Sequence, residues 1–457
     1  MKKVLQLLSL CMLSAASYEA VGQTTMKFFD KVLYFDGYHG LVSDSLYNAM
    51  SPLQLPSGLI RHRNDLYATK ISDAQLASIG TSLEMNVTIK ASCDNYDRIG
   101  NVNLALVPKG ATSYHPDSVD RIEIGRYITP FMNKNKQPDT VPYHYNINNV
   151  ANLLKETSVT SAYDVWVELE VFGVPYAANN EVAGCAGRSD VFFGSLEFVT
   201  SGATAAENTN LLVPVTFKHN LNNYDSVATD QVGTTKKTFD FNVSTALTDA
   251  MLVLITSNHG ANANGEEYNR RNHFVYFDNV EKLMYKPGRT SCEPFRKYNT
   301  QGNGIYGASP RSDAQWQSFS NWCPGDVIDT RIIPLGALTA GSHSFRIEVP
   351  QAVFAAGQGY IPVSLYLHGK TSGQFVSVAE LTQGNAYATI FPNPSHDIFS
   401  IEAEEKIETV TVVNLLGQTV FTGNTATIDL SKVPSGMYWA KITFNNEQSL
   451  TRKLIKN

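Results

Sequence analysis

The chain has 457 residues, of which 43% are hydrophobic and 17% are charged, and 36 basic against 42 acidic residues give a formal net charge of -6. At about 100–200 residues per domain, this length predicts two to four domains. The acidic balance argues against a nucleic-acid partner, which needs a basic footprint, and gives no reason to expect binding to an anionic membrane.

The chain begins with the pattern of a secretory signal peptide. Two lysines follow Met1, an apolar run covers 4–16, and small residues lie around 20–22. This order predicts a signal peptide over 1–22, and the run is too short to span a bilayer. Cys11 lies inside the run after a leucine, which argues against lipid attachment.

Four cysteines remain after the predicted cleavage: Cys93, Cys185, Cys292 and Cys323. An even number in an exported chain favours disulfides, and four cysteines allow three pairings. We expect Cys93–Cys185 and Cys292–Cys323, because each pair then stays inside one predicted domain. No CxxC or HxH spacing indicates a metal site.

Alternation of apolar and polar residues is the main periodicity of the chain. It covers 83–89, 165–171 and 361–367, and each segment predicts a half-buried strand. Only short stretches such as 73–79 and 149–156 have a helical pattern. Many strands separated by Gly, Asn, Pro and Asp turns predict an all-β protein made of sandwiches or jelly rolls.

Two shifts in composition predict the domain boundaries. The segments 201–206 and 371–385 are small and polar, as linkers are. We therefore predict β domains over 24–202 and 207–370, and a small β module over 386–457.

Three segments place charged residues where the pattern expects packing. Asp97 and Arg98 follow the strand over 83–89, and alternation puts Trp166, Glu168 and Glu170 on one face of another strand. The loop over 258–273 is dense in ionisable groups. Each segment alone also fits a solvated turn, face or loop. Converging carboxylates would support acid–base chemistry, because like charges raise one pKa.

At these residues the chain resembles a known family. The matching motifs are CDNYDRIGNV at 93–102, EIGRYITP at 123–130, Glu267-Tyr268 with Arg271 and His273, and WCPG at 322–325. They resemble the peptide-N-glycosidase F family, which cleaves N-glycans from asparagine. The resemblance covers about 28–370 and implies two eight-stranded jelly rolls side by side, with the site at their interface.

The resemblance assigns catalytic roles to three carboxylates. Asp97 matches the principal catalytic acid, Glu267 the second-domain glutamate and Glu168 a third carboxylate on a first-domain strand. The target is an amide, so its hydrolysis needs an activated water, and Asp97 is the candidate base. Glu267 and Glu168 would bind sugar hydroxyls or water.

The same comparison suggests the residues that contact substrate. Arg98 and Arg271 would supply positive charge to the oxyanion. Tyr268, Trp322 and Trp166 would present apolar faces to the sugars. Neither a metal nor another cofactor is implied, and the expected partners are N-glycosylated proteins or glycopeptides.

The chain departs from the family pattern at several positions. Phe319 stands where the family usually has arginine, and Gly265 and Asn269 stand where it has cysteines. The aromatic residue expected two positions after the third carboxylate is Glu170.

Two other hypotheses follow from the residues. Phe319 favours a non-catalytic glycan-binding or adhesive surface protein on the same scaffold. Copper chemistry needs paired histidines, and His259 with His273 substitutes poorly for an HxH pair.

The end of the chain has a recognisable pattern of its own. IFPNP at 390–394, VNLLGQ at 413–418, GMYW at 436–439 and RKLIK at 452–456 resemble the C-terminal sorting domain of the type IX secretion system. The resemblance implies contact with that secretion machinery and a location outside the cell or on the outer-membrane surface. We expect the exported protein to act as a monomer.

Overall fold

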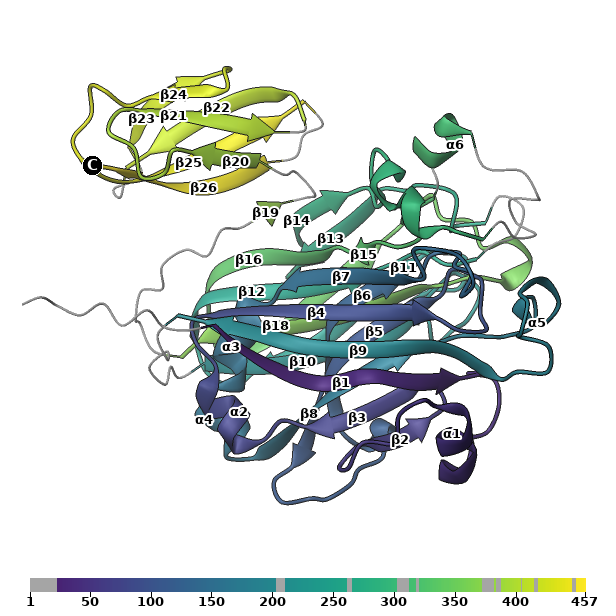
Figure 1. The fold of residues 1–457 in the computed structure, drawn as a ribbon. Helices are drawn as coiled ribbons and strands as arrows, with labels where there is room; N and C mark the ends of the chain where they lie inside the picture. The colour runs from purple at the N-terminus through teal and green to yellow at the C-terminus, as the bar shows by residue number, and fades with distance from the viewer. Residues whose placement is uncertain are drawn as a thin grey trace, which may run out of the picture.

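The computed structural model describes residues 23–457 except 203–209, 261–264, 302–311, 318–319, 372–381, 384–387, 404, 415–417 and 446–448. The predicted signal peptide, most of the predicted linker over 201–206 and Phe319 lie outside the described residues. Strands dominate the rest, which confirms the all-β prediction (Figure 1).

The first sandwich packs two sheets around one core that includes Leu33, Val87 and Leu169. One sheet has the order β1 (Thr24–Phe35), β9 (Asp190–Ser201), β4 (Ser82–Ala91), β7 (Thr140–Asn146). The other has the order β6 (Asp120–Ile128), β5 (Ile99–Pro108), β8 (Tyr163–Val171), β3 (Leu66–Lys70), β2 (Ile60–Arg63).

The second sandwich repeats this arrangement around its own core, which includes Leu252, Phe345 and Leu365. One sheet has the order β10 (Asn210–Leu221), β18 (Ile361–Lys370), β12 (Leu247–Thr256), β16 (Thr330–Leu338). The other has the order β11 (Lys236–Val243), β17 (Gly341–Glu348), β13 (His273–Phe277), β14 (Val280–Tyr285). In both sandwiches the first and last strands are neighbours and the chain crosses repeatedly between sheets, which is jelly-roll topology.

Helices are short and lie between strands. The α-helices are α1 (Asp44–Met50), α2 (Asp73–Ser78), α3 (Asn148–Leu154), α4 (Thr157–Thr160), α5 (Ala178–Glu181) and α6 (Asp313–Gln317). The 3-10 helices are η1 (Pro116–Ser118), η2 (Glu293–Tyr298) and η3 (Ala355–Gly357). Helices α2 and α3 confirm the two helical stretches predicted from periodicity. In the part of the chain that the structure describes, no helix combines the length and the apolar character needed to cross a membrane.

The C-terminal module is a separate small sandwich, set apart from the two jelly rolls in Figure 1 (yellow). One sheet has the order β19 (Thr382–Gln383), β26 (Ser449–Lys456), β25 (Gly436–Phe444), β22 (Ile407–Val413), β23 (Thr419–Gly423). The other has the order β20 (Ala388–Phe391), β21 (Ile398–Ala403), β24 (Thr427–Asp429). Phe399, Val412 and Leu454 belong to its own hydrophobic core.

The two jelly rolls are joined by backbone pairing. Strand β15 (Val327–Ile328), from the second half of the chain, pairs antiparallel with β6 of the first sandwich. A hydrophobic cluster that includes Ile128, Ile255 and Trp322 packs beside this joint.

A buried ion pair also connects the jelly rolls. A register shift leaves Ile124 of β6 without a partner on β5, and such bulges redirect side chains. Glu123 and Arg126 on either side of it pair at 2.7 and 2.6 Å, and both are fully buried. Arg126 Nη1 also donates to the Ser257 hydroxyl (2.8 Å) and the Pro362 carbonyl (2.9 Å) across the interface.

Candidate active site

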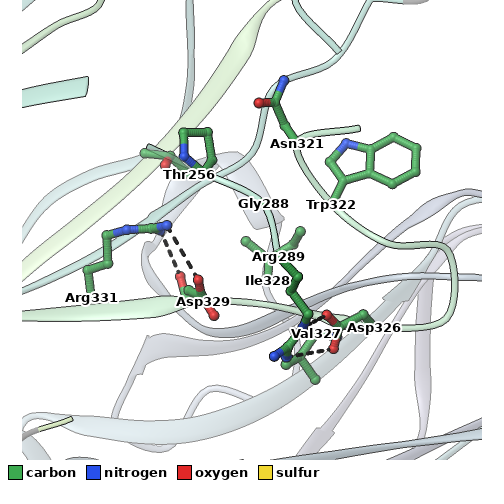
Figure 2. A pocket seen from close by; sticks show the side chains of 11 residues that line it. Thr256, Gly288, Arg289, Asn321, Trp322, Asp326, Val327, Ile328, Asp329 and Arg331 are labelled. Carbon is green, nitrogen blue, oxygen red and sulfur yellow. Dashed lines mark hydrogen bonds and ion pairs between the residues drawn. The ribbon is translucent and has the colours of Figure 1, made fainter. Parts of the chain in front are cut away.

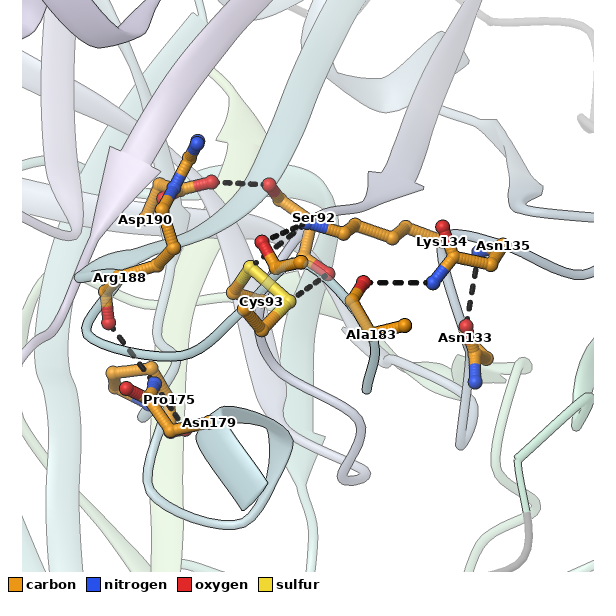
Figure 3. The surroundings of a disulfide bond; sticks show 12 residues. Ser92, Cys93, Asn133, Lys134, Asn135, Pro175, Asn179, Ala183, Arg188 and Asp190 are labelled. Carbon is orange, nitrogen blue, oxygen red and sulfur yellow. Dashed lines mark hydrogen bonds and ion pairs between the residues drawn. A yellow bond between two sulfur atoms is a disulfide. The ribbon is translucent and has the colours of Figure 1, made fainter. Parts of the chain in front are cut away.

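A disulfide fixes the start of the loop between β4 and β5. Cys93 bonds to Cys185 and Cys292 bonds to Cys323, which agrees with the pairing expected from the sequence. Figure 3 shows Lys134 beside the first bond, where its Nζ donates to the Gly184 carbonyl at 2.9 Å.

The buried carboxylate of Asp94 shapes the loop that carries Asp97. It accepts hydrogen bonds from the Tyr96 backbone N–H (2.9 Å) and the Arg98 Nε (2.7 Å). The backbone N–H of Val174, in the segment after β8, donates to it as well (2.6 Å). Three donors from separate positions hold the loop in one conformation.

The backbone on either side of Asp97 is also held by Thr129. The Arg98 N–H donates to the Thr129 hydroxyl (2.7 Å), and the Thr129 N–H donates back to the Arg98 carbonyl (2.8 Å). The Thr129 hydroxyl donates to the Tyr96 carbonyl (3.1 Å). Asp97 is therefore presented from a fixed backbone.

Glu267 lies in the loop before β13, which Asn321 holds in place. The Asn321 side-chain amide donates to the carbonyls of Glu266 (2.5 Å), Glu267 (2.9 Å) and Asn269 (3.2 Å). The carboxylate of Glu267 accepts from the Gly260 backbone N–H at 3.2 Å. Sequence reasoning did not single out Asn321, although it directly precedes the WCPG motif.

Asp97 and Glu267 come together although they belong to different jelly rolls. Burial and then the charge of Glu267 raise the pKa of Asp97 well above its usual range, against the opposing effect of Arg98. Burial also raises the pKa of Glu267, against hydrogen bonds from the Gly260 N–H and the Tyr268 hydroxyl. Asp97, Glu267 and Tyr268 are thus neighbours in the structure.

Trp322 lies in the hydrophobic cluster between the two jelly rolls. Its indole N–H donates to the Asn258 carbonyl at 3.0 Å, and its side chain packs with Cys292, Cys323 and Tyr96. Only 5% of Trp322 is exposed, so it offers little of its face to a sugar.

The pocket drawn in Figure 2 is distinct from the acidic site. Trp322 lines it, but neither Asp97 nor Glu267 does. Its charged groups pair with one another, Arg289 with Asp326 and Arg331 with Asp329.

The two arginines expected at the site have different surroundings. Arg98 pairs with Asp94 and lies over the Tyr96 ring at 5.1 Å, next to Asp97 in the chain. Arg271 pairs through its Nε with the buried Glu266 at 3.3 Å. The second arginine is thus engaged by a neighbouring carboxylate of its own loop.

Glu168 and Trp166, two further residues expected at the site, contact Asn103 and Tyr114 of the first jelly roll. They lie on one face of β8, as the alternation predicts, and the loop that carries Tyr114 covers them. Glu168 is fully buried and accepts from Asn103 (3.1 Å) and Tyr114 (2.7 Å). Trp166 is 5% exposed and packs edge-on against Tyr114, with 5.6 Å between ring centroids.

Glu170, one step along the same face, lies where the second jelly roll reaches over β8. Lys218 of β10 pairs with it at 2.5 Å, and Arg63 pairs with it at 2.9 Å. Burial raises the pKa of Glu170, but these two cations outweigh burial and leave the pKa below its usual range. Phe172 follows two positions later, which is the carboxylate–aromatic spacing of the family pattern.

Aromatic side chains from both jelly rolls lie near Glu170. Tyr38 is 70% exposed and packs edge-on against Phe172 at 5.2 Å. Tyr360, from the second jelly roll, has its pKa raised by burial and then by Tyr38. Sequence reasoning missed this group, because its members lie in three loops without a shared motif.

Gly265 and Asn269 remain linked, although neither is a cysteine. The Asn269 side-chain amide donates to the Gly265 carbonyl at 2.9 Å. This bond closes the loop that carries Glu267.

Comparison with protein families assigns all three parts of the chain. The model described as Peptide-N-glycosidase F, N terminal matches 25–186, and the one described as Peptide-N-glycosidase F, C terminal matches 223–368, together more than half of the chain. The Secretion system C-terminal sorting domain matches 389–457 and indicates export. No curated protein matches the chain.

Solved structures resemble the chain at low identity. A structure of PNGF-II is 19% identical with a TM-score of 0.55, and covers 77% of this chain. The chain spans 66% of the length of PNGF-II. PNGase F from Flavobacterium meningosepticum, described as a glycosylasparaginase, is 18% identical with a TM-score of 0.45, over 78% of this chain and 98% of that one.

A shared fold at such identity does not assign a reaction. The two adjacent family matches and the jelly-roll topology nevertheless agree with the motifs found in the sequence. The chain therefore belongs to the peptide-N-glycosidase F family and carries a C-terminal sorting domain of the type IX secretion system.

Proposed function

We propose that this chain is an exported amidase that hydrolyses the bond between an asparagine side chain and the first sugar of an N-glycan. The observation that carries the proposal is the meeting of Asp97 and Glu267 across the two jelly rolls, where Glu267 raises the pKa of Asp97. A carboxylate with raised proton affinity is suited to general base catalysis near neutral pH.

In the first step, Asp97 takes a proton from a water molecule whose oxygen attacks the amide carbonyl carbon. The electron pair of the C=O bond moves to oxygen and creates an oxyanion. Positive charge on Arg98, which Asp94 orients at 2.7 Å, stabilises the negative charge that develops.

In the second step, the oxyanion collapses and the C–N bond breaks. The proton held between Asp97 and Glu267 passes to the departing nitrogen, which leaves as the glycosylamine. The asparagine becomes aspartate. The reaction consumes one water and needs no cofactor in this scheme.

The surrounding side chains suit a sugar. Glu170 with Lys218 and Arg63 would contact hydroxyl groups, and Tyr38 would pack against a pyranose face. We assign the third carboxylate of the site to Glu170, because Glu168 is fully buried under Tyr114.

The test is glycan release from a denatured glycoprotein by the purified chain in the presence of a chelator. We expect conversion of glycosylated asparagine to aspartate, measured by mass spectrometry. Asp97→Asn should lower the rate by about 10²–10⁴-fold, the usual contribution of a general base. Undiminished release by Asp97→Asn would refute the role of Asp97.

The same preparation tests the alternative function. A wild-type protein that binds a glycopeptide in calorimetry, but releases no glycan, would be a glycan-binding surface protein on this scaffold.

A further inference from the structure

His259 occupies the segment after β12, next to Gly260. Its backbone exchanges hydrogen bonds with Tyr360 (3.0 and 2.9 Å), and its ring lies 6.2 Å from that of Trp322. The next residue, Gly260, donates its N–H to Glu267. His259 is thus one residue from a contact with the acidic pair.

A buried chain of hydrogen bonds fixes the ring of His259. Its Nε2 lies 2.7 Å from the hydroxyl of Ser257, which is 2% exposed. The same hydroxyl oxygen accepts from Arg126 Nη1 at 2.8 Å. Glu123 and the Pro362 carbonyl hold the fully buried Arg126 in place.

These partners determine where the imidazole carries its proton. A guanidinium only donates, so the Ser257 oxygen accepts from Arg126 and its own hydrogen needs another acceptor. Among the described residues, Nε2 of His259 is the remaining partner of that hydroxyl. Nε2 therefore accepts, and the proton of a neutral imidazole lies on Nδ1.

Nδ1 is available to a ligand. No hydrogen bond joins it to another described residue, and it is not among the buried polar atoms that lack a partner. Nδ1 is therefore in contact with solvent. Burial and then Arg126 lower the pKa of His259 to about 3, so the ring stays neutral at working pH.

We propose that His259 donates its Nδ1–H to the amide carbonyl oxygen of the substrate and stabilises the oxyanion, with Ser257 and Arg126 as positioning residues that fix its tautomer. This inference rests on the proposed amidase function. A neutral imidazole held in one tautomer can polarise a carbonyl without giving up its proton, so Asp97 and Glu267 carry the proton transfers.

The tautomer is tested without any need for activity. In the full exported chain labelled with ¹⁵N-histidine, long-range NMR correlations should show a proton on Nδ1 of His259, unchanged between about pH 5 and 8. Ser257→Ala removes the hydroxyl that fixes the ring, and its spectrum should show a mixture of tautomers. A proton on Nε2 in the wild type would overturn the inference.

Kinetics test the contact with substrate. His259→Ala should lower kcat by about 10²–10³-fold, the usual effect of losing one oxyanion donor. His259→Asn keeps a side-chain N–H near Nδ1 and should recover part of the rate. Ser257→Ala should lower kcat in the wild-type background but add no loss to His259→Ala.

The exposed His144, on the outer sheet of the first jelly roll, gives the matched control His144→Ala. An unchanged kcat in a folded His259→Ala variant would refute the contact. If the wild type releases no glycan, the proposed function fails separately. A shift of the Nδ1 resonance on adding a glycopeptide then decides whether His259 contacts the sugar–asparagine linkage.

Discussion

In the folded protein, burial and the charge of Glu267 make the ionised form of Asp97 unfavourable. Its pKa is raised in the folded state, so the folded protein binds this proton more tightly than the unfolded chain does. The free energy of unfolding therefore falls as pH rises from the ordinary aspartate range through the raised pKa. Above that pKa the full electrostatic cost is present.

We expect Asp97→Asn to stabilise the protein at about pH 8 more than at about pH 4. The gain is about 1.4 kcal/mol for each unit by which the folded state raises the pKa. Urea unfolding of wild type and variant at both pH values measures it. Equal differences at the two pH values would contradict the electrostatic origin.

Glu168 and Glu170 give a second test at the residue scale. Glu170→Gln should lower kcat/KM by about 10- to 100-fold, because a hydrogen bond involving a charged group contributes about 1.5–3 kcal/mol. Glu168→Gln should mainly lower the free energy of unfolding, since its partners Asn103 and Tyr114 are internal. Glycan release and urea unfolding of both variants separate these effects. A larger loss of activity in Glu168→Gln than in Glu170→Gln would show that Glu168 is the carboxylate that belongs to the site.

The alternation of residues predicted one face for Trp166, Glu168 and Glu170, and the structure has that face. Local periodicity does not say what covers each position. The loop with Tyr114 covers the first two, whereas Lys218 of the other jelly roll reaches Glu170. These contacts join residues far apart in the sequence. The alternation could therefore predict that the three side chains share a face of β8, but not which of them belongs to the proposed site.

At the scale of elements, the site depends on short connections rather than on strands. The Cys292–Cys323 bond closes a loop with a sequence separation of 31 residues and packs against Trp322. Cys292→Ser with Cys323→Ser should lower the free energy of unfolding by about 4 kcal/mol in the chain-entropy model. Denaturant unfolding measures the loss, with Cys93→Ser/Cys185→Ser for comparison. A stability equal to wild type would show that the packing alone holds this loop.

The buried ion pair of Glu123 and Arg126, which flank the bulge in β6, also stabilises the contact between the jelly rolls. Removing one partner of a buried pair leaves an uncompensated charge, so Arg126→Met should cost about 3–5 kcal/mol. The double variant with Glu123→Gln should cost less than Arg126→Met alone. Urea unfolding of the single and double variants measures the coupling. Additive losses would mean that the two side chains act independently.

At the scale of the whole molecule, the sorting module has a core of its own. Ending the chain after Thr371 should leave the thermal midpoint and the glycan release of the purified protein unchanged, because Phe399, Val412 and Leu454 belong to a hydrophobic core made of module residues. Calorimetry and the release assay check both properties. A truncated chain that unfolds early would show that the module supports the jelly rolls.

The overall architecture was largely predictable, whereas the joint between the jelly rolls was not. Alternation and turn composition indicated sandwiches, and the motifs around Asp97 and Glu267 suggested that these residues meet. The two-residue strand β15 is too short to leave a periodic signal, and its partner on β6 lies about 200 residues earlier in the chain.

The pairing of β15 with β6 restricts the motion of the two jelly rolls relative to each other. Strand β15 is hydrogen-bonded to β6 in a sheet of the first jelly roll. A hinge motion that opens or closes the two jelly rolls would therefore break these hydrogen bonds. The pairing therefore fixes the position of one jelly roll relative to the other. For the proposed amidase, the substrate would then have to adapt to the enzyme, so N-glycans on flexible or unfolded segments should be released faster than those on a rigid surface.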